Sequence, residues 1–286
     1  MIDAEAEAML QALHSRSVGG IKNHLQVLAE KGAENFMEKF YVGYGHKSIG
    51  DCGNVTLFIE GVSMLVAKAI QDTRLYSGQE SSTRYVDFSK QLFIDPSHSA
   101  AGEALLEEER AFYLSLLPVL QQHLLALFPR EEDQAESVYM KAISAKAFDI
   151  ARGFLPAGAS TNLAWHTNLR QLSDRLLYLR HHPLAEVREV AEAIETAMIE
   201  KYPHSFSGKR YEETETYLET VMQAYYFHQD IPEFHVVSDT IHTEQLKEIA
   251  ITLFTERPNA KTELPFRVNN LGTITFQFLL DFGSFH

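Results

Sequence analysis

A predicted strand and a predicted helix lead directly into a stretch dense in polar side chains. Residues 55–60 (Val-Thr-Leu-Phe-Ile-Glu) are predicted to form a buried strand, and residues 61–71 carry apolar side chains at helical spacing. Residues 74–85 then hold two arginines, one glutamate, one glutamine, three serines and one threonine. Because a helix must bury its apolar stripe against other elements, this order predicts a mixed α and β domain.

The polar stretch has the composition of a site for an anion. Guanidinium groups present a planar fork of donors to phosphate, and serine hydroxyls add further donors. A carboxylate can accept a hydrogen bond from a ribose hydroxyl or a base N–H. Composition alone also fits a polar edge strand over residues 82–88 with one solvated face, so the residues leave both alternatives open.

Helical patterns dominate the rest of the chain. Helices are predicted over residues 4–14, 21–40, 103–128, 132–150, 184–198, 211–227 and 243–254. Gly32 interrupts the second of these, and Pro118 should kink or divide the third. A glycine-rich turn is expected at residues 41–50, and strands at 266–282. We therefore expect an α+β fold in which an antiparallel sheet is packed with long helices.

The chain has an ordinary globular composition with an acidic balance. Its 286 residues are 45% hydrophobic and carry a formal net charge of −14. This charge argues against a nucleic-acid partner, which would need a basic face, but a few local arginines could still bind a mononucleotide. No apolar run reaches the roughly 18 residues of a membrane span, and the N-terminus lacks a secretory pattern.

Cysteine and histidine provide little sign of a nucleophile or a metal site. Cys52 is the only cysteine, so an internal disulfide is impossible and a reducing cytoplasm is expected. No base lies beside Cys52 in sequence, which favours a small buried apolar residue over a nucleophile. His181 and His182 are adjacent, would point apart on a helix and lack a zinc motif, so we predict no metal site.

The polar stretch resembles the signature of the flavin-dependent thymidylate synthases. That family has an Arg-His-Arg triplet, followed by Asn-Glu, a serine and Arg-Tyr. Here Arg74 stands at the third position of the triplet, Glu80 and Ser82 match the acidic residue and the closing serine, and Arg84 follows. The first two triplet positions hold aspartate and threonine, and an aspartate there would repel a diphosphate.

Two further segments resemble the same family. His46 and Ser48 match a Gly-His-x-Ser/Thr element upstream of the signature. Downstream, Arg152 begins an Arg-x-x-Leu-Pro pattern, and Asn168 and Arg170 form Asn-x-Arg. The match then departs from the family, which has Asn or His where Asp174 stands. The arginine that ends the family's Leu-x-Leu-Arg pattern comes one residue late, at Arg180.

The resemblance implies a reaction and a set of roles. The reaction is reductive methylation of dUMP to dTMP, with methylenetetrahydrofolate as the methylene donor and NADPH-reduced FAD as the hydride source, in a homotetramer with active sites between subunits. Arg180 would be catalytic, acting on the pyrimidine. The nucleotide would be held by Glu80, Ser82, Arg84 and Arg152. The flavin would be held by His46, Ser48, Arg74, Ser77, Asn168 and Arg170.

The departures also allow a second interpretation. Asp72, Thr73, Asp174 and Arg180 all fall on ligand-contacting positions, so the chain could be a catalytically degenerate copy that serves as a scaffold or a nucleotide-binding half of a tandem enzyme. We expect one synthase-like domain over residues 1–206. Residues 207–286 are interpreted as a helical linker and the start of a second copy, because residues 272–284 echo 54–63. On this interpretation the chain is a fragment of a longer tandem protein.

Overall fold

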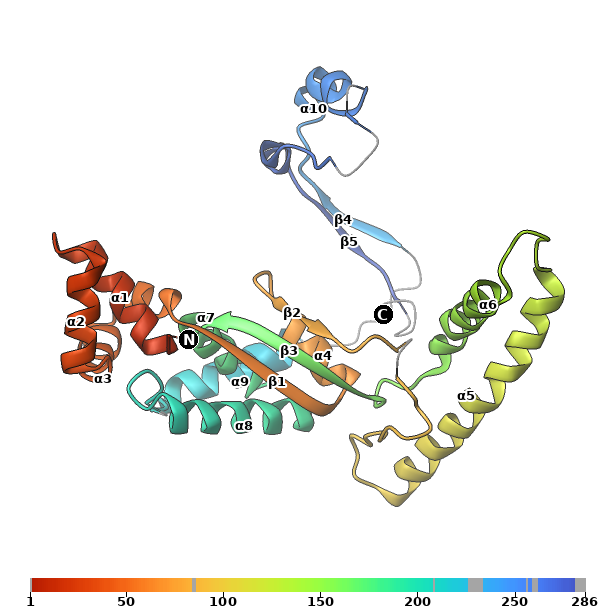
Figure 1. Cartoon of the computed structure of the whole chain (residues 1–286), viewed down its shortest axis with the longest axis horizontal. Coiled ribbons are helices and arrows are strands. Elements are labelled where there is room, and N and C mark those ends of the chain that lie inside the picture. Colours follow the sequence, from red (N-terminus) through yellow and green to blue (C-terminus); the bar gives the residue numbers. More distant parts are fainter. Residues whose placement is uncertain are drawn as a thin grey trace. The chain divides into compact units, whose positions relative to one another are not determined.

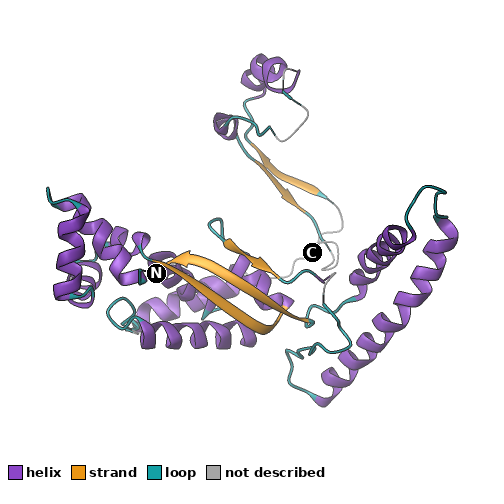
Figure 2. Ribbon diagram, viewed as in Figure 1, coloured by secondary structure: helices purple, strands orange, loops and turns teal. Residues whose placement is uncertain are grey.

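The computed structural model describes residues 2–83, 86–207, 209–225, 234–255, 257–258 and 262–280. Contacts between residues divide the chain into two compact units, Met1–Phe227 and His228–His286. Helices outnumber strands in the part that is described, and the strands pair into two small antiparallel sheets (Figure 2). The expected α+β class is therefore confirmed.

A three-stranded antiparallel sheet lies at the centre of the first unit. The middle strand is β3 (Ser160–Asn168), flanked by β1 (Asn54–Ser63) and β2 (Ser77–Glu80) (Figure 1). Glu80 lies opposite Leu163 in the register of β2 and β3. This pairing brings the polar stretch beside the second motif segment, which the sequence interpretation had not assigned to a strand.

The polar stretch does contain an edge strand, as one of the two alternatives held, but this strand lies earlier in the chain than residues 82–88. Pairing covers Ser77–Glu80, and none of the described residues among 81–88 belongs to a strand. The backbone N–H of Ser81 still donates to the carbonyl of Asn162 at 2.8 Å. The ladder therefore stops where the serine-rich part of the signature begins.

The sheet is covered on one face only, so β1 is half-buried rather than fully buried as predicted. Val55 and Ile59 point into the core, whereas Phe58 on the opposite face is 78% exposed. Alternation of this kind is typical of an antiparallel sheet with one solvated face. The strand also runs on to Ser63, so the following helix starts three residues later than expected.

Four helices pack behind the sheet (Figure 1). They are α4 (Met64–Gln71), α7 (Leu169–Leu179), α8 (Ala185–Lys201) and α9 (Glu212–Tyr225). Apolar side chains of α4 and α7 meet the inner face of the sheet around Trp165, which is 1% exposed, while α8 packs against both of these helices and α9 packs against α7. Leu172 and Leu176 of α7 are equally enclosed. This core fixes the position of α7 relative to β3.

The N-terminal segment is helical, as predicted. It comprises α1 (Ala4–Arg16), α2 (Ile21–Lys31) and α3 (Glu34–Phe36), followed by a π-helical segment, Met37–Gly43, and a 3₁₀ helix, Lys47–Cys52. Gly32 ends α2 with a φ of 68°, which only glycine adopts readily. The predicted turn at 41–50 is thus shorter, with helical backbone on both sides.

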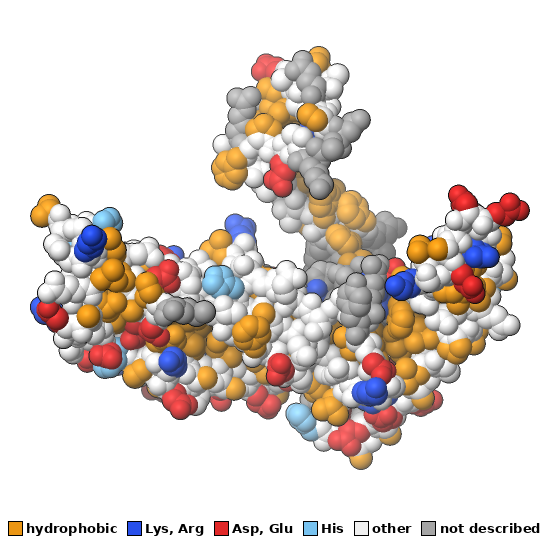
Figure 3. Space-filling view, viewed as in Figure 1, with side chains coloured by type: hydrophobic (Ala, Val, Ile, Leu, Met, Phe, Trp, Pro, Cys, Tyr) orange, Lys and Arg blue, Asp and Glu red, His pale blue; other side chains and the backbone are white. Residues whose placement is uncertain are grey.

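Two long helices form a hairpin within the first unit. They are α5 (Ala100–Leu127) and α6 (Glu136–Ala151). Pro118 lies inside α5, which continues past it as one helix, so of the two expected outcomes the division does not occur and the kink stays a prediction. Hydrophobic side chains are visible over the hairpin (Figure 3), and Leu105, Phe112 and Val119 are at least half exposed. No helix in the described ranges is both long and apolar enough to span a bilayer.

The second unit contains a two-stranded sheet and a short helix. β4 (His235–Asp239) pairs with β5 (Ile274–Gln277) in antiparallel fashion, and α10 (Thr243–Ala250) lies between them in sequence. A strand was predicted in the region of β5 and a helix in the region of α10. The interpretation of residues 207–286 as a linker and a partial second copy stays a prediction, and residues 281–286 lie outside the described part.

Candidate ligand site

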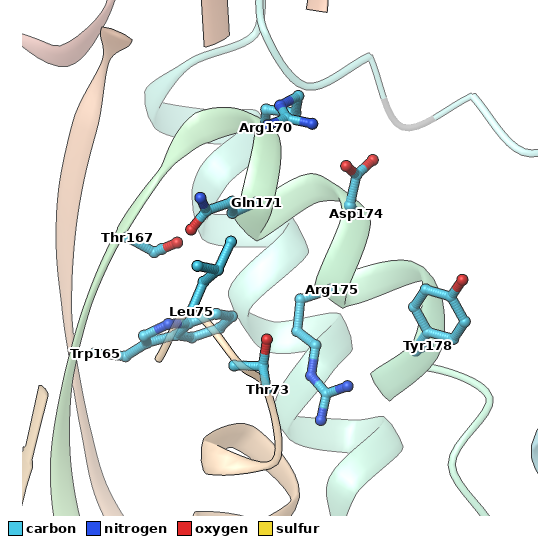
Figure 4. A pocket seen from close by; sticks show the side chains of 9 residues that line it. All are labelled: Thr73, Leu75, Trp165, Thr167, Arg170, Gln171, Asp174, Arg175 and Tyr178. Carbon is cyan, nitrogen blue, oxygen red and sulfur yellow. The ribbon is translucent and has the colours of Figure 1, made fainter. Parts of the chain in front are cut away.

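A cavity of about 270 Å³ opens where the signature stretch meets the second motif segment (Figure 4). Two of its residues come from the loop between α4 and β2, two from β3, and five from α7. The lining residues are Thr73, Leu75, Trp165, Thr167, Arg170, Gln171, Asp174, Arg175 and Tyr178. The two motif segments, distant in sequence, therefore line one cavity.

Helix α7 presents one of its faces to this cavity. Gln171, Asp174, Arg175 and Tyr178 are spaced by three, one and three residues, which places them on one side of an α-helix. Asn168 caps the helix, because its Oδ1 accepts a hydrogen bond from the backbone N–H of Gln171 at 2.9 Å. Since α7 follows β3 without a loop, the cap also fixes the direction in which this face points.

Two ion pairs join the rim of the cavity to the Lys47–Cys52 helix. Arg170 Nε donates to Asp51 Oδ1 at 2.6 Å, and Lys47 Nζ lies 3.7 Å from Asp174 Oδ1. The hydrogen bond to Asp51 raises the pKa of Arg170 above its usual range. Burial, with Asp174 and Asp51 nearby, raises the pKa of Tyr41 to about 12. The rim is thus a set of alternating charges, in which Asp51 partly offsets the charge of Arg170.

Arg175 is held differently. Its Nη2 donates to the backbone carbonyl of Ala69 at the end of α4, while its Nε is buried and has no hydrogen-bond partner among the described residues. Burial, reinforced by Arg175 and Arg188, lowers the pKa of the neighbouring His182 to about 4. This imidazole is therefore neutral at ordinary pH, although the Asp72 carboxylate acts on it in the opposite direction.

Arg180 lies in a network of ion pairs behind the sheet. Its Nε and Nη2 both donate to the carboxylate of Glu215 on α9, the first at 2.9 Å, and its Nη1 lies 3.4 Å from Glu195 Oε1 on α8. The side chain is only 7% exposed. His181 Nε2 is 2.9 Å from the same Glu215 carboxylate, and the hydrogen bonds from Arg180 lower the pKa of Glu215. Arg180 does not line the cavity.

Sequence comparison places this architecture in a known family. The family described as thymidylate synthase complementing protein matches residues 2–204, which is more than half of the chain. The chain belongs to this family. The match ends before α9, which nonetheless packs in the same compact unit as the matched residues.

Several curated proteins are related in sequence to this chain. The UPF0159 protein of Chlamydia muridarum (strain MoPn / Nigg) is 32% identical over 183 residues, covering 60% of this chain and 35% of that protein. A UPF0159 protein of Thermoplasma acidophilum is 25% identical over 207 residues, covering 61% of this chain and 42% of that protein. The chain thus spans about a third of the length of the chlamydial relative it matches.

Solved structures of low sequence identity are also similar to the chain. Flavin-dependent thymidylate synthase ThyX from Helicobacter pylori, complexed with FAD and dUMP, is 18% identical with a TM-score of 0.41, covering 72% of this chain and 93% of that one. The UMP/dUMP methylase PolB from Streptomyces cacaoi, bound with 5-Br dUMP, is 16% identical with a TM-score of 0.42, covering 71% and 88%.

None of the three described residues that the family resemblance assigns to the nucleotide lines the cavity. Glu80 lies on the inner face of β2, where its Oε2 accepts from Gln71 Nε2 at 2.7 Å and its Oε1 is buried without a partner among the described residues. Ser82 follows the end of β2. Arg152 begins a short 3₁₀ helix after α6, outside the cavity lining. Arg84 lies outside the described residues.

Among the predicted flavin-binding residues of this family member, Arg170 lines the cavity. Asn168 lies next to it but uses its side-chain oxygen as a helix cap. His46 and Ser48 are exposed; His46 caps the 3₁₀ helix whose Lys47 and Asp51 reach the rim, and Ser48 lies within that helix. Arg74 and Ser77 are also exposed, but neither lines the cavity. Arg74 lies in sequence between the lining residues Thr73 and Leu75, and Ser77 is on the open face of the sheet.

The sequence interpretation missed Gln171, Arg175 and Tyr178 as site residues. Their spacing in the sequence could have identified them, because they lie at helical spacing from one another and just beyond Arg170. They were missed because the family motif assigns no role to Arg175. No cluster of three or more metal-ligating side chains occurs in the part of the chain that is described.

Proposed function

We propose that the chain binds a pyrimidine nucleotide, dUMP, together with part of a flavin, at and beside the cavity between the α4–β2 loop and α7, as part of thymidylate synthesis. Family membership supports the reaction class. The observation that carries the proposal is the meeting of Arg170 and Arg175 with two threonine hydroxyls and the Gln171 amide at one cavity. In a chain of net charge −14, this local group of cationic and hydrogen-bonding side chains is suited to an anionic, ring-containing ligand.

The lining divides into groups that suit different parts of a nucleotide. Trp165 and Leu75 supply apolar walls for a flat ring. Thr73, Thr167 and Gln171 can donate to and accept from the polar edge of the base or the ribose. The buried, unpartnered Oε1 of Glu80 is available to an N–H or O–H donor close by. In this family the chemistry needs such positioning rather than an enzyme nucleophile, which agrees with the absence of a base beside Cys52 in sequence.

The residues of one chain do not fit a complete FAD molecule at this cavity. Its volume of about 270 Å³ is below the range of roughly 300–1,000 Å³ for pockets that hold a drug-sized ligand. The Asp174 carboxylate in its lining would oppose a diphosphate. We propose that any FAD extends beyond the cavity, over the exposed His46, Ser48 and Arg74, and that neighbouring subunits of a homotetramer complete its site.

The overall reaction would convert dUMP, methylenetetrahydrofolate, NADPH and a proton into dTMP, tetrahydrofolate and NADP⁺, with the flavin carrying the hydride. We place this reaction in the cytoplasm, where a chain with one cysteine stays reduced. The catalytic role that the resemblance gives to Arg180 stays part of the proposal. It would require release of the guanidinium from Glu215 and Glu195.

The test is calorimetric titration of the purified protein with dUMP, together with a visible spectrum in the presence of FAD. We expect micromolar binding of dUMP and none of thymidine, which lacks the phosphate. A coupled assay with methylenetetrahydrofolate and NADPH then measures dTMP formation. Failure to bind dUMP at millimolar concentration would overturn the proposal.

Departures from the family motif favour a second candidate function, in which the chain binds a nucleotide without catalysing a reaction. Asp72 and Thr73 replace the first two residues of the flavin-binding triplet, Asp174 adds a carboxylate to the cavity, and Arg180 is committed to Glu215. A protein of this kind would bind dUMP in the titration but give no flavin spectrum and no dTMP. The two functions are therefore separated by the same pair of measurements.

A further inference from the structure

We infer that a cavity among the N-terminal helices is a second binding site, for an aromatic dicarboxylate. The cavity lies between α1, α2 and the segment formed by α3 and the π helix that follows it, and its volume is about 550 Å³ (Figure 1). This volume is within the range of roughly 300–1,000 Å³ for pockets that hold a small organic ligand. None of its lining residues lines the cavity beside α7, and the family resemblance assigns none of them a role.

The walls of this N-terminal cavity are largely apolar. They come from three helical segments, and within two of these segments the lining residues are four positions apart, on one side of the helix. The apolar wall residues are Met9, Leu13, Val27, Phe36 and Phe40. All but Met9 are only partly buried, so a ligand that covers them removes apolar surface from water.

Two cations stand in this apolar lining. Arg16 is in the last turn of α1 and Lys31 is in the last turn of α2, and they are the only charged side chains among the described lining residues. Neither forms an ion pair with a carboxylate in the part of the chain that the structure describes. Two free cations beside apolar walls are complementary to a ligand that has an apolar body and two carboxylates.

The carboxylates nearby offset only part of this charge. Glu34 lies beside the lining, since its Oε2 would be 2.9 Å from a Cβ added at the lining glycine. Glu30 accepts a hydrogen bond from Gln26 Nε2 at 2.9 Å, and Glu38 Oε2 lies 3.5 Å from His204 Nδ1. Neither of these two lines the cavity, so Arg16 and Lys31 remain available to an anion.

Aromatic rings favour a flat ligand over an alkyl chain. The rings of Phe36 and Phe40, both in the lining, have centroids 4.8 Å apart. Phe40 is also 5.8 Å from the Tyr44 ring and 6.5 Å from the His46 ring, with interplanar angles of 31° and 22°. These four rings form a continuous aromatic surface, and a planar ring packs well against such a surface.

This surface leads from the cavity to His46, a residue that the resemblance assigns to the flavin. The methylenetetrahydrofolate of the proposed reaction ends in an aminobenzoyl-glutamate group, which is an aromatic dicarboxylate. We therefore assign the cavity to that end of the co-substrate. This choice of source rests on the proposed function, whereas the chemistry of the site does not.

The test is calorimetric titration of the full chain with 4-aminobenzoyl-L-glutamate, in the absence of dUMP and FAD. We expect a dissociation constant below about 1 mM. 4-Aminobenzamide lacks both carboxylates and glutarate lacks the ring, so each should bind at least tenfold more weakly. Laurate should also bind more weakly. Tighter binding of laurate would overturn the inference, because the site would then suit an alkyl acid.

Substitutions locate the site. Arg16→Gln and Lys31→Gln should each weaken binding of 4-aminobenzoyl-L-glutamate about fivefold, because each removes one carboxylate partner. Lys22→Gln, an exposed cation on the same helix as Lys31 that does not line the cavity, is the matched control and should stay within about twofold of the parent. Circular dichroism shows that each variant is folded.

Absence of binding by the parent, parent-like binding by both cavity variants, or an equal loss in Lys22→Gln would overturn the inference. Titration with dUMP separates it from the proposed function, and Arg16→Gln and Lys31→Gln should bind dUMP as the parent does. Binding of 4-aminobenzoyl-L-glutamate without binding of dUMP would support the site and reject the function. The opposite result would support the function and reject the site.

Discussion

Arg170 Nε and Asp51 Oδ1 lie 2.6 Å apart, and this ion pair joins α7 to the 3₁₀ helix at the rim of the cavity. The side chains are 36% and 33% exposed, so the pair contributes only about 1 kcal/mol or less to stability. Its larger effect is electrostatic, since the carboxylate offsets the charge that Arg170 presents to a ligand.

Replacing Asp51 should therefore strengthen nucleotide binding. In Asp51→Asn the amide oxygen can still accept from Arg170, but the negative charge is gone. We expect dUMP to bind about two- to fivefold more tightly at low salt, and the gain to shrink as ionic strength rises. Calorimetric titration measures it. Asp87→Asn, which alters an exposed carboxylate 3.2 Å from Lys90, is the control. Weaker binding by Asp51→Asn would contradict the expectation.

Gly78 is essential for the pairing of β2 with β3. A Cβ at this position would lie 2.0 Å from the carbonyl oxygen of Ala164, so Gly78→Ala must push the edge strand away. We expect a loss of about 2 kcal/mol or more in the free energy of unfolding, measured with urea. Gly153→Ala is the matched control, because a Cβ there meets nothing within 4 Å. Equal stability of the two variants would show that β2 tolerates the displacement.

Glu215 should be a major stabilising residue of α9. Glu215→Gln leaves Arg180 buried without its bidentate partner. Since the Glu215 side chain is 21% exposed, we expect a loss of about 2–3 kcal/mol, somewhat below the value for a fully buried pair. Thermal and urea unfolding measure it. Glu213→Gln, an exposed position two residues earlier on the same helix, should change stability by less than about 0.5 kcal/mol. A similar effect at both positions would argue against the network.

Stability should depend on pH through His182. Burial and two guanidiniums lower its pKa from 6.5 to about 4. Between these values the unfolded chain binds a proton that the folded chain does not. The contribution of the neutral His182 to the free energy of unfolding is therefore fully present above about pH 6.5. As the pH falls toward 4, up to about 3 kcal/mol of it is lost.

Urea unfolding of the parent and of His182→Gln from pH 4 to 7 tests this dependence. The variant has no imidazole at this position, so its stability should change less over the same range. His123→Gln alters an exposed histidine and should keep the slope of the parent protein. If His182→Gln kept that slope too, the pH dependence would have to come from other groups.

The fold class and most helices could be predicted because they depend on local patterns. Gly32 marked the end of α2, and its positive φ explains why. The middle strand β3 was missed for a physical reason. Thr161 and Thr167 occupy buried positions on its inner face, so the alternation of apolar and polar residues is weak. The edge strand was misplaced because its register is decided by pairing with β3, which local sequence does not encode.

The candidate site could be predicted in part. The resemblance identified Arg170 and brought two distant segments together, and both line the cavity. It did not identify Arg175, whose role depends on the face of α7 rather than on a motif. The environment of Arg180 was also beyond sequence reasoning, because its partner Glu215 is on another helix and lies outside the residues that match the family.

The Arg180–Glu215 pair has an evolutionary consequence. In relatives that lack a helix equivalent to α9, an arginine at the position of Arg180 would lack the Glu215 counterion. We therefore expect either an uncharged residue there or an arginine that has another role. Among relatives that have the helix, the two positions should vary together. The ancestry of α9 could therefore be traced from the residue that caps the C-terminus of α7.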